Sequence, residues 1–153
     1  MLVFLISFLV LIFDQLTKVW AIKNFQGKSD LSLFGGKLKF TYLENRGAAF
    51  GILQGSQTFF FIVTIFVLGF LLYSLFRYKK SSRFFHITFG LIIGGALGNF
   101  IDRLRLNYVV DFIQIDFVDF YSFPIFNVAD IGVTLGGLLI VFYLFFSKEG
   151  VDQ

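Results

Sequence analysis

The sequence contains no cysteine, and it has only one proline and one histidine among its 153 residues. Without cysteine the chain can form no disulfide, no thiolate metal site and no thiol nucleophile. The single histidine, His86, makes a histidine-based metal centre or a Ser/His/Asp triad improbable. Any chemistry must therefore come from carboxylates, amides and hydroxyls.

Apolar and aromatic side chains are abundant instead. Hydrophobic residues make up 57% of the chain and aromatic residues 21%, with a mean hydropathy of +0.81. The apolar fraction is higher than that of soluble domains and predicts an integral membrane α-helical protein. The net charge of +3 comes largely from short basic clusters, which are more typical of topology determinants than of a nucleic-acid surface. We therefore expect no nucleic-acid partner.

Four windows are long and apolar enough to cross a bilayer, which requires about 20 such residues. They cover residues 2–24, 58–76, 84–104 and 128–147. The first window has no basic segment ahead of it and no small-residue cleavage pattern, so we expect a retained helix rather than a secretion signal. The sequence thus predicts four transmembrane helices in a single membrane-embedded domain over residues 1–153.

Basic residues indicate the orientation of these helices. Arg77, Lys79, Lys80 and Arg83 crowd the link between the second and third windows, and Lys148 follows the fourth. The positive-inside rule places these segments, and with them both termini, in the cytoplasm. The loops at 25–57 and 105–127 then lie on the outer face.

The first outer loop contains a pattern typical of a strand. In KLKFTY, residues 37–42, polar and apolar side chains alternate with the period of a half-buried β-strand. We expect a small β-sheet on the membrane surface here. GAAFGIL, residues 47–53, is either a short interfacial helix or an apolar loop that dips into the headgroups.

Polar residues within the apolar windows gather at one depth. Asp14 lies about 18 Å along the first helix, one turn before Lys18, with which it can form an ion pair. In the predicted topology the charged and asparagine side chains in or at the edge of spans three and four also lie in the outer half: Asn99, Asp102, Arg103, Asn127 and Asp130. Each feature also has a purely structural explanation. The Asp14–Lys18 pair could serve helix packing, and the glycines at 94, 95 and 98 could allow close approach of another helix. Asp130 could be a simple N-terminal cap. Their common depth nevertheless predicts a functional site.

Two carboxyl groups that share a proton are the obvious chemistry for such a site, which makes aspartic peptide hydrolysis the leading hypothesis. The candidate partners of Asp130 are Asp14, Asp102, Asp111, Asp116 and Asp119. Asp102 has Arg103 and Arg105 close by, so we expect it to stay ionised in an ion pair. Asp111 lies among Val109, Val110, Phe112 and Ile113, whose burial raises a carboxyl pKa. Asp111 is the preferred partner.

Two other interpretations stay open. A divalent-cation site built from Asp111, Asp116 and Asp119 is conceivable but has no recognised ligand spacing. A small proton-coupled transporter or a structural helix bundle would require a polar path to the inner face. The inner halves of the windows are almost entirely Phe, Leu, Ile and Val, which counts against transport.

Five short motifs resemble those of bacterial lipoprotein signal peptidase, also called signal peptidase II. They are DQLTK at 14–18, ENRGAAFG at 44–51, GGALGNFIDRL at 94–104, VVDFI at 109–113 and FNVAD at 126–130. The resemblance covers nearly the whole chain, and the motifs occur in order on the expected helices and loops.

The resemblance implies an aspartic endopeptidase that removes the signal peptide from diacylglyceryl-modified prolipoproteins, cutting just before the lipidated cysteine. It implies no metal and no organic cofactor. The catalytic pair of the family falls on Asp111 and Asp130, with Asp102 as the second choice of partner for Asp130. The supporting polar residues fall on Asp14, Lys18, Asn45, Asn99, Asp102, Arg103 and Asn127.

The same resemblance implies a location and partners. We expect a multi-pass, monomeric protein of the bacterial cytoplasmic (inner) membrane, with its active site at the outer leaflet. Its expected partners are prolipoprotein signal peptides with diacylglyceryl-cysteine and the surrounding membrane phospholipids.

Overall fold

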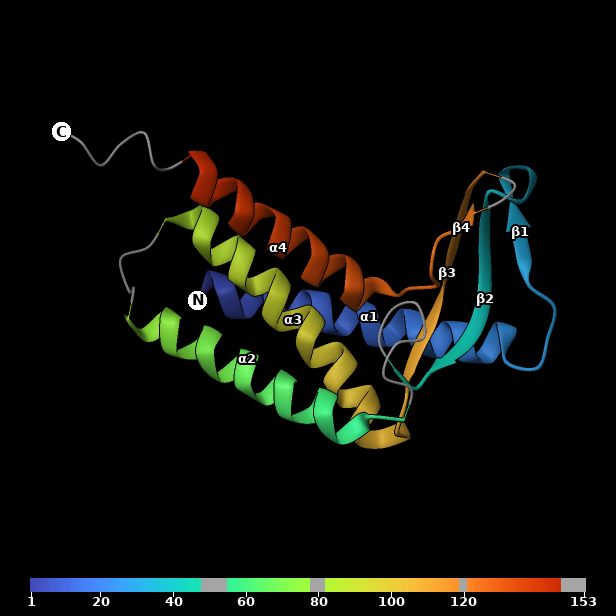
Figure 1. Cartoon of the computed structure of the whole chain (residues 1–153), viewed down its shortest axis with the longest axis horizontal. Helices are drawn as coiled ribbons and strands as arrows, with labels where there is room; N and C mark the ends of the chain where they lie inside the picture. The colour runs from blue at the N-terminus through green and yellow to red at the C-terminus, as the bar shows by residue number, and fades with distance from the viewer. Residues whose placement is uncertain (48–54, 78–81, 119–120, 147–153) are drawn as a thin grey trace.

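Four helices form an elongated bundle with a small sheet at one end (Figure 1). This computed structural model describes residues 1–47, 55–77, 82–118 and 121–146. The helices are α1 (Leu2–Phe25), α2 (Gln57–Arg77), α3 (Arg83–Leu106) and α4 (Val128–Phe146). Each coincides with one of the windows expected from the sequence. α1 begins and α4 ends at the end of the bundle away from the sheet (Figure 1).

The helices have the length and surface of membrane spans. By length and composition α1, α2 and α3 could each cross a membrane, and the described apolar part of α4 covers Val128–Tyr143. Large apolar side chains such as Phe4, Phe66 and Phe70 are exposed on the bundle surface, whereas Asp14 and Lys18 are almost completely buried. This reverses the pattern of a soluble protein and indicates a membrane-embedded one.

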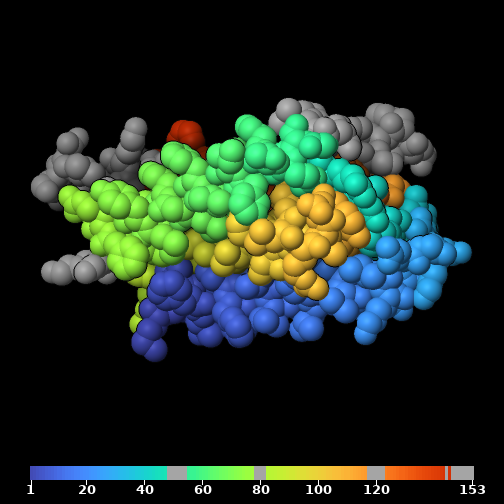
Figure 2. Space-filling view, turned by 90° about the horizontal axis from the view of Figure 1, so that it is seen from below, coloured from blue at the N-terminus to red at the C-terminus, as the bar shows by residue number. Residues whose placement is uncertain are grey.

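α3 lies at the centre of the bundle. Figure 2 shows it reaching the surface between α1 and α2, and α4 packs along it in Figure 1. Its glycines allow the close approach that the sequence predicted: a Cβ on Gly94 would lie 2.7 Å from the Ser7 carbonyl oxygen of α1, and one on Gly95 would collide with the Ala129 carbonyl oxygen of α4. Such contacts let helices pack closely where apolar burial offers little driving force.

Two caps determine where α3 begins and ends. The Ser82 hydroxyl accepts a hydrogen bond from the Phe85 amide at 3.3 Å, which satisfies a free donor of the first turn. Asn107 takes a left-handed conformation, with φ of 63°, and its amide bonds the Arg103 carbonyl. The chain therefore leaves α3 and enters the sheet after a single further residue.

The sheet has four antiparallel strands in the order β1-β2-β3-β4. They are β1 (Leu31–Leu33), β2 (Leu38–Asn45), β3 (Val109–Val118) and β4 (Tyr121–Ser122), with a 3-10 turn, η1 (Phe34–Gly36), after β1. The strand expected at KLKFTY is confirmed as part of β2. GAAFGIL, expected to be either an interfacial helix or an apolar loop, lies outside the described residues except for Gly47.

Aromatic contacts fix the sheet to the end of α1. The Trp20 ring meets the rings of Phe25, Phe40 and Phe112 edge-on, at centroid distances of 5.0, 5.4 and 6.2 Å. Paired backbone hydrogen bonds of 2.9 Å join Ile113 to Phe126, just before α4. Strand β3 is thereby fixed to both the first and the last helix.

Candidate active site

Asp130 and Asn127 cap the first turn of α4 reciprocally. The Asp130 amide donates to Asn127 Oδ1 at 2.9 Å, and the Asn127 amide donates to Asp130 Oδ2 at 3.1 Å. This is a capping box, so the cap considered as the alternative for Asp130 is present. It uses only one carboxylate oxygen, because Oδ1 accepts from Asn99 Nδ2 of α3 at 2.7 Å. The cap therefore holds Asp130 in place without excluding a further role.

A buried ion-pair cluster lies beneath this turn. Lys18 Nζ is 2.9 Å from both Asp14 Oδ2 and Asp102 Oδ2, which confirms the Asp14–Lys18 pair expected from the sequence. The other oxygen of Asp14 accepts from the Ala129 amide at 2.8 Å. A side chain of α1 thus satisfies a free donor at the start of α4.

The expected pairing of Asp102 with Arg103 is wrong. Asp102 bonds Lys18, and it also accepts from the Val110 amide at 3.1 Å. Neighbouring side chains on a helix point in different directions, so Asp102 faces α1 and the start of β3 while Arg103 faces α2. The Arg103 guanidinium lies 4.9 Å from the centroid of the Phe60 ring.

Asp111 lies on β3 directly after the amide that Asp102 holds. Its side chain is 1% exposed. Asn45 Nδ2, at the end of β2, donates to Asp111 Oδ2 at 2.8 Å, and Asn127 Nδ2 donates to Asp111 Oδ1 at 2.6 Å. Burial, and then the nearby charge of Asp130, raise the pKa of Asp111 to about 7 despite these two donors.

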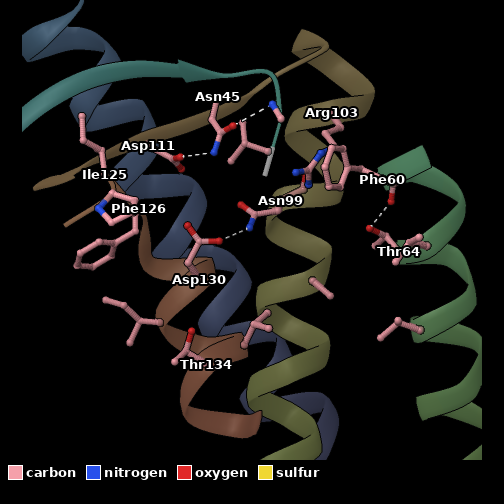
Figure 3. A pocket seen from close by; sticks show the side chains of 18 of the residues that line it. Asn45, Phe60, Thr64, Asn99, Arg103, Asp111, Ile125, Phe126, Asp130 and Thr134 are labelled. Carbon is pink, nitrogen blue, oxygen red and sulfur yellow. Dashed lines mark hydrogen bonds between the residues drawn. The ribbon is translucent and has the colours of Figure 1, made fainter. Parts of the chain in front are cut away.

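Two asparagines connect the carboxyl groups of Asp111 and Asp130. Asn127 donates to Asp111 and to Asn99 Oδ1, at 2.6 and 3.1 Å, and Asn99 donates to Asp130. Both amides present N–H groups to the carboxyl oxygens. The two carboxyl groups are thus linked through Asn99 and Asn127. Figure 3 shows two of the donors in place, Asn45 beside Asp111 and Asn99 beside Asp130.

Both carboxyl groups line a cavity of about 610 Å³. Asn45, Asn99 and Arg103 surround its polar end (Figure 3). Its apolar part passes between α2 and α4, past side chains that include Phe60, Val63, Val67, Ala96, Val133 and Leu135. The arrangement can hold a peptide at the carboxyl pair while apolar groups of the same ligand lie between the helices.

All nine site residues predicted from the sequence belong to this cluster or line its cavity. Sequence reasoning missed Gln15, whose Nε2 donates to Asp102 Oδ1 at 3.0 Å and to the Gly98 carbonyl at 3.3 Å. Its position next to Asp14 in the DQLTK motif was the available signal. The Val110 amide was also missed, since a backbone donor leaves no trace in composition.

The structure describes two of the three carboxylates considered for a cation site, Asp111 and Asp116. Asp116 pairs with Lys39 at 2.8 Å, and Asp119 lies outside the described residues. Among the residues that the structure describes, no three His, Cys, Asp or Glu side chains are grouped to hold a metal ion.

The transporter alternative required a polar path to the inner face. Between Asp14 and the far end of the bundle, the buried polar side chains of the described residues are the hydroxyls of Ser7, Ser74 and Thr88. The Ser7 and Ser74 hydroxyls bond backbone carbonyls, at 3.1 and 2.8 Å. The described part of the bundle therefore offers no ionisable relay in that direction.

The chain is similar to known proteins over nearly its whole length. A family model described as signal peptidase (SPase) II matches residues 6–146. The lipoprotein signal peptidase of Lactobacillus johnsonii is 41% identical over 95% of this chain and 92% of its own length, and that of Clostridium tetani is 42% identical over 97% and 95%. A solved structure of a bacterial membrane enzyme has a TM-score of 0.84 at 38% identity, covering 99% of this chain and 91% of that one.

Proposed function

The chain belongs to the signal peptidase II family and has the protease activity of a lipoprotein signal peptidase, and on this premise we propose that Asp111 and Asp130 are its catalytic pair. The observation that carries the proposal is the shared set of donors: Asn127 contacts both residues, and both carboxyl groups face the same cavity. Asp102, the second choice of partner, is instead occupied by Lys18, Gln15 and the Val110 amide.

The two carboxyl groups differ in environment, and this difference assigns their roles. Asp130 accepts from Asn99 and from the Asn127 amide, and a helix N-terminus favours a negative charge. Asp111 is the more deeply buried of the two, and burial raises its pKa to about 7. Asp130 therefore acts as the general base that activates water, and Asp111 as the acid that protonates the scissile carbonyl or the leaving amine.

The cavity supports a substrate that enters from the lipid. Helices α2, α3 and α4 all contribute lining side chains, and α3 lies between the other two in Figure 3. The signal peptide of a prolipoprotein would lie in the apolar part of the cavity, called the groove below. Its scissile bond would lie at the carboxyl pair, and the acyl chains of its diacylglyceryl-cysteine would stay in lipid. The protein would then be a monomer with a single domain, and its four helices would cross the cytoplasmic membrane. Both termini would lie inside and the site at the outer leaflet.

The acid role of Asp111 predicts a loss of activity at high pH. Its raised pKa means that the singly protonated pair persists up to about pH 7 and is lost above it, so kcat/KM should fall as the pH rises through this value. The measurement is cleavage of a diacylglyceryl-modified prolipoprotein peptide between pH 5 and pH 9.

Asn45→Ala provides the matched variant, because the Asn45 donor lowers the pKa of Asp111. Its removal should move the falling limb to higher pH. A limb that does not move in Asn45→Ala, or activity that rises up to pH 9, would show that Asp111 is not the acid.

The groove predicts a substitution that weakens substrate binding without changing the chemistry. Val67→Trp adds a large ring to the wall on α2, below the carboxyl pair. We expect KM to rise about tenfold or more with little change in kcat, since misfits of a methylene group or more in an apolar pocket cost this much.

Phe66→Trp is the control for Val67→Trp. Phe66 is the neighbouring residue, is 75% exposed on the bundle surface and does not line the cavity. Equal KM values for the two variants, or a kcat that falls while KM stays constant, would place the substrate elsewhere.

A further inference from the structure

Lys18 is a buried cation that the proposed chemistry does not use. It is 1% exposed, and its ammonium makes three polar contacts of 2.9 Å, with Asp14 Oδ2, Asp102 Oδ2 and Asn99 Oδ1. The first two form an ion-pair cluster that joins α1 to α3. The third links this cluster to the catalytic pair, and a purely structural ion pair has no need of it.

The ammonium determines which way the Asn99 amide points. An ammonium has three donors and no acceptor, so only an oxygen can face it. With Oδ1 directed to Lys18, Asn99 Nδ2 is directed to Asp130 Oδ1 at 2.7 Å. A flipped amide would set Nδ2 against the ammonium and Oδ1 against the carboxylate, which is unfavourable at both ends.

The same orientation extends to the second asparagine. Asn99 Oδ1 also accepts from Asn127 Nδ2 at 3.1 Å, and Asn127 Nδ2 donates to Asp111 Oδ1. Asn127 Oδ1 accepts a hydrogen bond from the Asp130 amide, and this bond fixes the oxygen end of the Asn127 side chain. Hydrogen bonds in such a chain polarise one another.

We propose that Lys18 is a positioning residue that acts through Asn99: it holds the Asn99 amide with its N–H groups toward Asp130 and thereby keeps Asp130 as the ionised member of the catalytic pair. The inference rests on the proposed roles of Asp111 and Asp130. Lys18 itself touches neither the substrate nor the reacting atoms. Its contribution is to kcat, in addition to its separate contribution to helix packing.

A double-mutant cycle separates these two contributions. Lys18→Met, Asn99→Ala and the double variant are assayed for kcat and KM with a diacylglyceryl-modified prolipoprotein peptide, per mole of folded monodisperse protein. Lys18→Met should lower kcat about ten- to hundredfold with little change in KM, the size expected when a hydrogen bond to a charged group is lost. In the Asn99→Ala background, Lys18→Met should lower kcat no further.

Thermal stability should behave differently in the same four proteins. Lys18→Met removes the partner of Asp14 and of Asp102, and these contacts do not involve Asn99. The loss of stability should therefore persist in the double variant. If the effects on kcat multiply as independent effects do, Lys18 acts through packing alone and the proposal is wrong.

Two further variants keep the test decisive. Ser7→Ala removes another buried polar contact between α1 and α3, with the Gly90 carbonyl, and should leave kcat unchanged. If Lys18→Met yields no folded protein, Asn99→Asp decides, because it keeps an acceptor for Lys18 but presents an acceptor to Asp130. Its kcat should fall below that of Asn99→Ala; an equal or higher value overturns the inference.

The proposed catalytic pair is tested separately in the same assay. If Asp111→Asn or Asp130→Asn still cleaves the peptide at the wild-type rate, the proposed pair fails, whatever Lys18 does. If both are inactive and the cycle is additive, only the inference about Lys18 fails.

Discussion

Asp111→Asn and Asp130→Asn should each lower the rate of signal-peptide cleavage by about a thousandfold or more, within the range that loss of a general acid or base produces. At Asp111 the asparagine cannot supply an acidic proton, and its NH2 group would face a donor, either Asn45 Nδ2 or Asn127 Nδ2. At Asp130 it cannot accept a proton from water. The measurement is the gel shift of a diacylglyceryl-modified prolipoprotein at equal amounts of folded enzyme.

Asp116→Asn is the control for these variants. Asp116 is a carboxylate of the same strand as Asp111, but it pairs with the partly exposed Lys39 and does not line the cavity. The Asp116→Asn variant should cleave the prolipoprotein at close to the wild-type rate. If Asp111→Asn retained activity and Asp102→Asn did not, Asp102 would be the partner of Asp130 after all.

The second large effect concerns stability. Asp102→Ala should lower the free energy of unfolding by about 3–5 kcal/mol, the typical cost of breaking a buried ion pair from one side. The substitution leaves Lys18 with one carboxylate and deprives the Val110 amide of its acceptor. Unfolding in detergent, followed by circular dichroism, measures the loss.

Asp116→Ala is the comparison for Asp102→Ala. The side chains of Lys39 and Asp116 are 33% and 18% exposed, so water screens this pair and its loss should cost no more than about 1 kcal/mol. Similar losses of unfolding free energy in both variants would mean that the buried ion pair of Asp102 contributes no more to stability than the partly exposed pair of Asp116.

The sequence allowed the helices and the clustering of their polar residues to be predicted for simple physical reasons. Bilayer thickness sets the length of an apolar span, so each helix was found to within two residues at either end. The cost of a charge in lipid makes each polar residue in a span informative. Asp111 was preferred over Asp102 because its apolar neighbours predict burial and Asp102 was expected to be ion-paired. The structure buries both, at 1% and 3% exposed, and pairs Asp102 with Lys18.

Tertiary contacts were harder to predict. Arg103 is next to Asp102 in sequence, yet the cation that pairs with Asp102 comes from another helix, 84 residues earlier. Strand β3 was treated as loop, although VVDFIQIDFV is rich in the β-branched and aromatic residues that favour strands. Its partner, β2, lies beyond two helices in the chain, so no local pattern shows the pairing.

The bond between Asp14 of α1 and the Ala129 amide of α4 has a consequence for biogenesis. Synthesis runs from the N-terminus, so the helix that carries this acceptor emerges long before the helix that carries its donor. In the interval Lys18, one turn away, can neutralise Asp14 within the membrane. The last helix brings Asn127 and Asp130 together with the donor, so the proposed catalytic pair is not assembled in a chain that lacks this helix. If Asp130 is catalytic as proposed, the protease becomes active only once its final helix has docked, and an unfinished copy would leave the signal helices around it intact.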